Sequence, residues 1–211
     1  GTDNDFTTFF DSIYIQDETG GITLFPYDRK GLAPGTKVRV TGRTDTYQGD
    51  LELQILSLEI LKEPAQVIQP EKVTAKDAMD YAAKGGSLLQ VEGEVVDVIL
   101  TADGKGVTQF DLMDENGDTA RVFIDGYILS GTTGKNDLAK IVKEGNAISA
   151  VGLSYMHPEG DSERNVAVLR VRNCDEGAYI PPKPDPSNPR TADRRFGWLE
   201  QSFIPDTLRS A

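Results

Sequence analysis

An internal repeat is the feature of this sequence that most constrains its fold. Residues 13–25 (IYIQDETGGITLF) align with residues 110–123 (FDLMDENGDTARVF). The segments Gly35–Gly42 and Gly145–Gly152 follow with the same spacing between their glycines, and each is followed by a polar turn and an alternating segment. Two motifs repeated in the same order indicate two copies of one structural unit.

Each copy is predicted to consist of strands joined by turns, because apolar and polar residues alternate with a period of two. The first copy has four clear strands, and its first strand is either irregular, within residues 1–10, or missing. The second copy has five strands, with helical spacing of apolar residues between its third and fourth strands. This is the order of a five-stranded Greek-key OB barrel, so the sequence predicts an all-β protein with minor helices and two tandem OB barrels. The expected strands are 12–16, 21–25, 36–46, 50–59, 88–100, 107–114, 119–124, 146–155 and 164–173, with the helix at 134–144.

These elements predict four segments along the chain. Residues 1–65 form the first barrel, residues 66–87 a helical linker, and residues 88–177 the second barrel. In the linker, Thr74 is the predicted N-cap of a helix over residues 75–83. Residues 178–211 form a proline-rich spacer and a tail, which holds the only tryptophan, Trp198, and is expected to dock on a neighbouring domain.

Charge and composition narrow the possible functions. The 211 residues include 34 acidic and 22 basic side chains, a net charge of −12, which argues against broad non-specific attraction to nucleic acid. The single cysteine (Cys174) and the single histidine (His157) argue against a disulfide framework and a multi-ligand metal site, so no metal or cofactor is expected. No apolar run is long enough for a membrane span. The chain begins at Gly1 without a leader, and we expect a processed chain.

A candidate ligand site falls on the first copy. OB barrels bind ligands on the face formed by their second and third strands. If the isoleucines and valines of the first copy point inward, their neighbours point outward, and this set includes Tyr14, Phe25, Arg39, Arg43 and Tyr47. Rings that stack on bases and arginines that meet phosphates predict binding of single-stranded DNA or RNA. The alternative is that Tyr14 and Phe25 close an open barrel end or pack on the linker.

The second copy is the weaker candidate. Its outward set is expected to be Asp111, Met113, Arg121 and Phe123, with fewer rings and cations. Residues 88–177 carry 8 basic and 16 acidic side chains, against 6 and 11 in residues 1–65. The first copy is therefore the predicted anion-binding unit, and the second a spacer or protein-contact module.

Four segments carry a resemblance to a known group of proteins. Residues 14–21, 35–42 and 47–49 resemble OB-fold modules of bacterial extracellular nucleases and of cell-surface or lipoprotein-type proteins, and residues 70–96 resemble the entry to such a module. The resemblance covers residues 10–175. It implies a non-enzymatic accessory role in nucleic-acid binding and an extracellular or cell-envelope location in a bacterium. A scaffold module that binds protein or glycan remains the alternative function, and the oligomeric state is open.

Other motifs have simpler structural interpretations. Asp114–Asp118 resembles the opening of a calcium loop, but it lacks the closing glutamate and is predicted to be a turn. Glu92 and Glu94 share one face of a strand, as on the solvated side of a sheet. His157 is predicted to be a surface turn residue, and the glycine-rich segments 104–106 and 131–135 to be loops. A cryptic hydrolase would need convergent carboxylates that the sequence does not supply, so no catalytic residue is expected.

Overall fold

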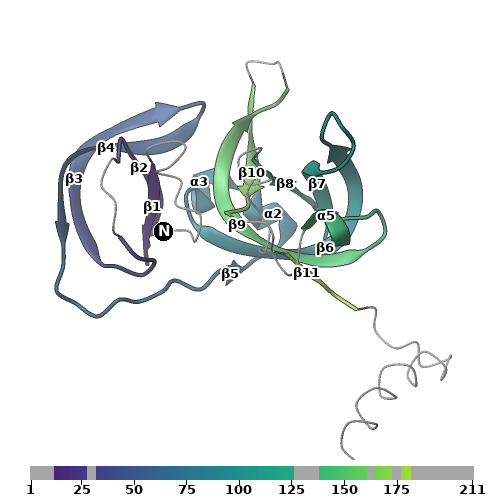
Figure 1. The fold of residues 1–211 in the computed structure, drawn as a ribbon, viewed down its shortest axis with the longest axis horizontal. Helices are drawn as coiled ribbons and strands as arrows, with labels where there is room; N and C mark the ends of the chain where they lie inside the picture. Colours follow the sequence, from purple (N-terminus) through teal and green to yellow (C-terminus); the bar gives the residue numbers. More distant parts are fainter. Residues whose placement is uncertain (1–11, 28–31, 126–137, 161–163, 173–176, 182–211) are drawn as a thin grey trace, which may run out of the picture. The chain divides into compact units, whose positions relative to one another are not determined.

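The computed structural model describes residues 12–27, 32–125, 138–160, 164–172 and 177–181. The chain divides into two compact units, residues 1–180 and 181–211, and all but one of the described residues belong to the first. Within this unit, strands β1–β4 form one group and β6–β10 another (Figure 1). The observed strands are β1 (Ile13–Asp17), β2 (Gly20–Phe25), β3 (Val38–Tyr47), β4 (Asp50–Ile60), β5 (Glu71–Lys72), β6 (Leu88–Leu100), β7 (Val107–Met113), β8 (Thr119–Phe123), β9 (Ala147–Pro158), β10 (Asn165–Arg170) and β11 (Gly177–Tyr179).

The second group of strands is a closed barrel, which we call the second barrel. Strands β6, β7 and β8 pair in succession, β8 pairs with β10 in parallel, and β10 pairs with β9 in the antiparallel sense. Strand β9 returns to β6 and closes the ring. This pairing is that of the predicted five-stranded OB fold, which confirms the predicted fold class.

The first group, which we call the first sheet, has the strand order β1-β2-β4-β3. Its β2–β4 pair is parallel and its β3–β4 pair antiparallel, as between β8–β10 and β9–β10 of the second barrel. The repeat in the sequence therefore corresponds to a repeat in topology, with β1–β4 in the places of the second to fifth OB strands. The expected place of the first strand, residues 1–10, lies outside the described residues.

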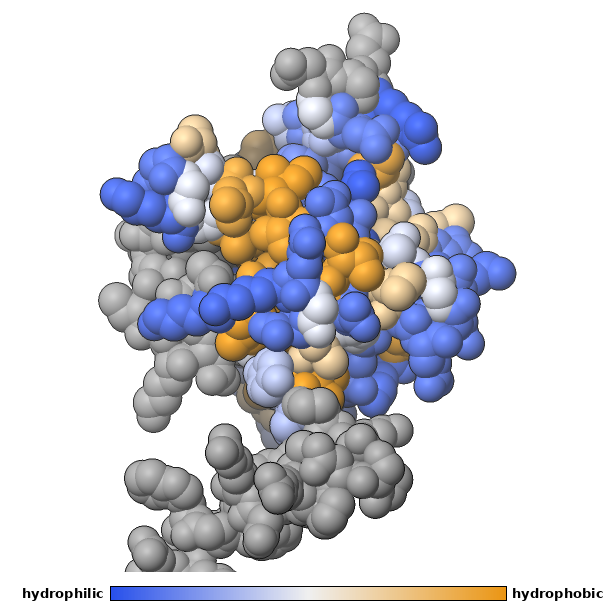
Figure 2. Space-filling model, turned by 90° about the vertical axis from the view of Figure 1, so that its right-hand side faces the viewer, coloured by the Kyte–Doolittle hydropathy of each residue, from blue (hydrophilic) through white to orange (hydrophobic). Residues whose placement is uncertain are grey.

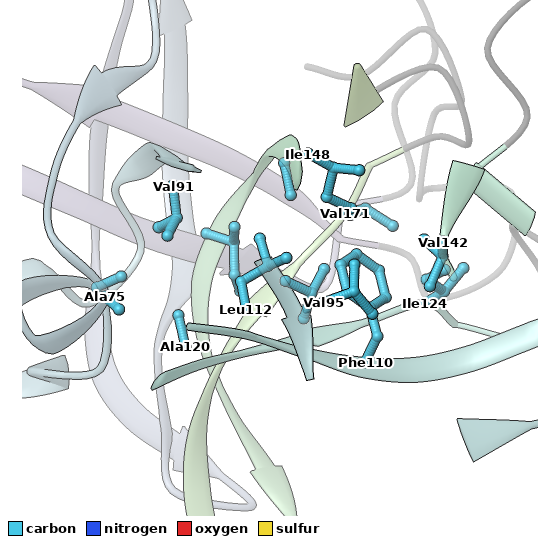
Figure 3. Packing of buried hydrophobic residues seen from close by; sticks show 14 of the residues in the cluster. Ala75, Val91, Val95, Phe110, Leu112, Ala120, Ile124, Val142, Ile148 and Val171 are labelled. Atoms are coloured by element: carbon cyan, nitrogen blue, oxygen red, sulfur yellow. The ribbon is translucent and has the colours of Figure 1, made fainter. Parts of the chain in front are cut away.

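The core of the second barrel explains why its strands close. Inward-facing apolar side chains on alternate positions of β6, β7 and β8 are fully buried, among them Val91, Phe110 and Val122. Figure 3 shows Ala75, from the linker, at one end of this cluster and Val142 at the other. A single cluster of this size supplies most of the hydrophobic stabilisation of such a barrel.

The linker helix is interrupted, which corrects the expectation of one helix over residues 75–83. Helix α2 (Ala75–Ala78) begins at Thr74, whose Oγ1 accepts a hydrogen bond from the Asp77 N–H, as predicted for an N-cap. A second helix, α3 (Tyr81–Lys84), begins after Asp80, whose carboxylate accepts a hydrogen bond from the Ala83 N–H. The second N-cap ends the first helix because Asp80 bonds to the backbone in place of continuing the helical ladder.

The other expected helix ends three residues earlier than predicted, at Ile141. Helix α5 spans Leu138–Ile141, and residues 134–137 lie outside the described part of the chain. The Asn146 side-chain amide donates to the Ile141 carbonyl oxygen and satisfies the end of the helix, and Gly145 has a φ of +82°. Residues 177–179, at the start of the expected spacer, form strand β11, which pairs with β9. Cys174 and Trp198 lie outside the described residues.

Candidate nucleic-acid interface

Tyr14 lies in the contact between the first sheet and the second barrel. Its ring packs against the core cluster of the second barrel, and its hydroxyl accepts a hydrogen bond from Arg170 Nη1 at 3.3 Å. Burial raises the pKa of Tyr14, although the Arg170 guanidinium opposes this shift. Arg170 is itself buried, pairs with Asp125 at 3.2 Å and lies 4.7 Å from the centre of the Tyr155 ring. Tyr14 therefore serves the contact between the two parts, a packing role that differs from the expected closure of a barrel end or packing on the linker.

A buried carboxylate reinforces the same contact. Asp50, 2% exposed, accepts hydrogen bonds from the hydroxyls of Thr23 and Tyr81, both at 2.9 Å. The backbone N–H of Met156 in β9 donates to it at 3.4 Å. Burial raises the pKa of the Asp50 carboxyl, while the hydroxyl donors act in the opposite direction. Because these donors come from the first sheet, the linker and the second barrel, Asp50 joins all three.

The other four predicted residues of the first copy lie on the outer side of the first sheet. Phe25 and Tyr47 are exposed by 38% and 57%. Phe25, Gln54 and Arg43 are neighbours in register across β2, β4 and β3, so they share one face. Arg43 has no ion pair among the described residues. The structure thus brings Phe25 and Arg43 together on an exposed face.

This face also carries carboxylates that compete with an anionic ligand. Arg39 is paired with Glu59 at 2.9 Å. Glu52 and Asp45 are register partners beside the Phe25–Arg43 row. Burial, together with the nearby charges of Asp50 and Asp45, raises the pKa of Glu52, as expected where negative charges gather. The first sheet therefore exposes the Phe25 ring and Arg43 next to the carboxylates of Asp45 and Glu52.

The second barrel, which the sequence indicates as the weaker candidate, carries a groove of about 440 Å³. Its walls come from β7, β8, the β9–β10 hairpin and the linker helices. Two residues of the predicted outward set, Asp111 and Arg121, are in its lining, while Met113 is exposed nearby on β7. The lining residues are Met79, Tyr81, Asp111, Thr119, Arg121, Met156, Arg164, Asn165, Val166 and Ala167.

Two arginines and two carboxylates set the charge in this groove. Asp111 holds Arg121 at two points, with its oxygens 3.2 Å from Nε and 3.4 Å from Nη2. These hydrogen bonds raise the pKa of Arg121. Glu159 lies 3.4 Å from Arg121 Nη1 and 3.8 Å from Arg164 Nε, so it bridges the two guanidinium groups. The four charges cancel, but both arginines reach the groove.

An aromatic pair lies on β8 and β9, outside the lining of the groove. The rings of Phe123 and His157 stack with centroids 3.9 Å apart at an angle of 27°. His157 belongs to β9, opposite Val166, and is half-buried, so the expectation of a surface turn residue is wrong. Burial and the Arg170 charge lower the pKa of His157, which keeps the imidazole neutral near pH 7. The pair is therefore an uncharged stack, and Phe123 lies two residues from Arg121 on the same strand.

The sequence analysis missed several residues of this groove. Arg164 comes from the β9–β10 hairpin, and the methionines Met79 and Met156 come from the linker and from β9. Glu159 contacts both arginines from the same hairpin but is not part of the lining. The hairpin between the last two OB strands is a known ligand-binding loop, so its arginine could have been singled out from the predicted topology alone. The linker residues Met79 and Tyr81 could not have been predicted, because nothing in the local sequence indicates that they lie beside β8.

The other motifs have structural roles where the structure describes them. Asp114 accepts backbone hydrogen bonds from Ala75, Asn116 and Asp118, so its carboxylate fixes the predicted turn and the start of α2. Glu92 is paired with Lys72 at 2.7 Å. No cluster of metal-ligating side chains occurs among the described residues. The same part of the chain holds no helix long and apolar enough to cross a membrane.

The fold and the groove define this chain as an OB-fold protein with a repeated topology. No family model matches it. It is 32% identical over 98 residues to Protein ORF1940 of Acidianus two-tailed virus, a match that covers 39% of this chain and 5% of the viral protein. The chain thus spans a small fraction of that relative's length.

Two solved structures are similar in part. One is the Plasmodium falciparum SSB complex with ssDNA, at 18% identity and a TM-score of 0.27, covering 44% of this chain and 91% of that one. The other is a Replication Protein A heterotrimer bound to ssDNA, at 13% identity and a TM-score of 0.28, covering 90% of this chain and 46% of that one. Both scores are low, so the fold assignment rests on the strand pairing described above.

Proposed function

We propose that this chain is a non-enzymatic OB-fold protein that binds single-stranded nucleic acid in the groove of the second barrel. The observation that carries the proposal is that Arg121 and Arg164 line the groove, while Phe123, two residues after Arg121 on β8, stacks on His157 of β9. All four lie on β8 or the β9–β10 hairpin, where OB folds bind oligonucleotides. Arginines meet phosphates and flat rings accept bases, in any sequence.

The proposal keeps the first sheet as a secondary surface. Phe25, Arg43 and Tyr47 are exposed there, and a strand leaving the groove would find a ring and a cation on it. Tyr14 and Arg39 are not assigned to binding, because the first serves the contact with the second barrel and the second is paired with Glu59. An accessory role beside a catalytic domain or an anchor, in the extracellular space or cell envelope of a bacterium, remains part of the proposal.

Fluorescence anisotropy with labelled dT and rU 20-mers at low salt tests this function. Replacing Arg121 and Arg164 together by glutamine should weaken binding and reduce the slope of log affinity against log salt by about 1.4, or about 0.7 for each lost phosphate contact. Arg39→Gln is the matched control, because it removes an arginine of the first sheet. No binding at high micromolar protein would contradict the proposal, as would binding that the double variant leaves unchanged.

A second function, a scaffold module that contacts protein or glycan, is favoured by a different observation. Figure 2 shows apolar side chains gathered on one face of the molecule. Strand β6 carries exposed Val96, Ile99 and Leu100 on its second half. Isolated exposed apolar residues are common, but a group of them marks a contact surface. If the oligonucleotides do not bind, this surface becomes the leading candidate, and Leu100→Ser should then reduce capture of a partner.

A further inference from the structure

We infer that Glu159 occupies, in the free protein, the place that a phosphate group of the ligand takes in the complex. The inference rests on the proposed function and adds a regulation to the same site. Glu159 acts as an internal competitor whose carboxylate must leave the two arginines before a strand can bind. Its removal should therefore strengthen binding.

The geometry of Glu159 is that of a bridging anion. One carboxylate oxygen lies 3.4 Å from Arg121 Nη1 and the other 3.8 Å from Arg164 Nε. The two oxygens thus face two different cations, as the non-bridging oxygens of a phosphate would. Both distances are longer than in strong charge-assisted hydrogen bonds, which measure about 2.7–2.9 Å. The side chain is 43% exposed, so these contacts are weak and can be displaced.

Asp111 makes the opposite kind of contact with the same arginine. Its two oxygens bind Nε and Nη2 of Arg121, and its side chain is only 17% exposed. This two-point contact fixes the plane of the guanidinium and leaves Nη1 directed at Glu159. Asp111 is therefore a positioning residue that stays in place, whereas Glu159 is the group that a ligand replaces.

The backbone around Glu159 allows its side chain to move alone. The Glu159 N–H donates to the Arg164 carbonyl oxygen at 2.8 Å, which closes the β9–β10 hairpin beside the groove. The exchange replaces one anion by another on the same two cations, so the groove need not open for a strand to enter.

The pair Glu159→Gln and Asp111→Asn tests this inference, because each variant removes one negative charge that contacts Arg121. Affinities for the dT and rU 20-mers are measured by anisotropy at one salt concentration. We expect Glu159→Gln to bind about three- to tenfold more tightly, as loss of two weak ion pairs would give. We expect Asp111→Asn to bind no more tightly than the wild type, because Arg121 loses its orientation. Thermal unfolding of both variants checks that each is folded.

The outcomes separate this inference from the proposed function. Equal gains in both variants would overturn the inference, since they would reflect net charge alone. Wild-type binding that Glu159→Gln leaves unchanged or weakens would also overturn it, while the proposed function would stand. Absence of binding in the wild type and in both variants would refute the proposed function, and the inference with it. Binding by Glu159→Gln alone would support both.

Discussion

Gly21→Ala should separate the first sheet from the linker, because no side chain fits at this position. A Cβ at Gly21 would lie 2.0 Å from the carbonyl oxygen of Gly86 and 2.3 Å from its carbonyl carbon. It would also lie 2.9 Å from the backbone nitrogen of Ser87. All three neighbours are backbone atoms, so no side chain can rotate away. Gly86 has a φ of +72°, a conformation that glycine adopts readily, and thus both glycines serve this close approach.

The size of the effect follows from the required movement. Real Cβ contacts below 3.0 Å are essentially absent, so the two segments must move apart by about 1 Å. The nearest hydrogen bonds are those from the Gly86 N–H to Ser154 at 2.9 Å and from the Leu88 N–H to the Gln16 side chain at 2.8 Å. Overpacking of this kind costs about 1–3 kcal/mol, and a clash between backbones belongs at the upper end. At about 2–4 °C per kcal/mol, the Tm should fall by about 6–12 °C.

Thermal unfolding followed by circular dichroism measures the fall in Tm. Hydrogen exchange of the Gly86 and Leu88 amides measures the loosened contact. Gly117→Ala is the control, because a Cβ there meets nothing within 4 Å and only its φ of +82° opposes alanine. That conformational cost is about 1–2 kcal/mol. The reasoning would be refuted if Gly21→Ala unfolded no earlier than Gly117→Ala, or if both amides kept their protection.

Two further predictions concern stability. Burial raises the pKa of Asp50, so the folded state binds a proton at this carboxyl more readily than the unfolded state does. The protonated carboxyl therefore contributes to stability at low pH, and this contribution is lost as pH rises through the raised pKa. Asp50→Asn should therefore gain stability relative to the wild type as pH rises from about 4 to 7, and a difference in Tm that does not vary with pH would argue against it. Phe110→Ala, at a fully buried position of the core, should lower the free energy of unfolding by about 3–5 kcal/mol. Leu56→Ala, at an exposed position, should change it by no more than about 0.5 kcal/mol in urea denaturation, and comparable losses would contradict the assigned core.

Most of the fold could be predicted from the sequence, because alternation and turn signals are local. The observed strands of both copies lie within a few residues of the expected ones, and the repeat predicted the shared topology. The helices were less predictable. The break at Asp80 depends on competition between a side chain and the helical ladder, and good helix formers on both sides concealed it.

The candidate site was harder to predict, because it depends on which faces are covered. Alternation places Tyr14 on the outer side of its strand, and the structure agrees with that orientation. The sequence does not show that Arg170, 156 positions later, meets the Tyr14 hydroxyl there. In the same way, the sequence around Arg121 does not show that the hairpin carrying Glu159 and Arg164 lies beside it in the fold. Long-range contact, not residue type, decides which outward face is open.

The use of the β1–β2 face as a contact with the second barrel has a consequence for stoichiometry. Two OB modules on a flexible tether can grip one strand together, and their affinities then combine through a high effective concentration. Here the first sheet is joined to the second barrel through Tyr14, which accepts a hydrogen bond from Arg170, and through Asp50, which accepts one from the Met156 N–H. The part of the β1–β2 face that carries Tyr14 is therefore used for assembly. Under the proposed function, the second barrel would cover one footprint of about 4–16 nucleotides, and the first sheet would add only the contacts of its exposed Phe25, Arg43 and Tyr47. Longer nucleic-acid strands would then bind more copies of the chain, while the affinity of each copy would not increase.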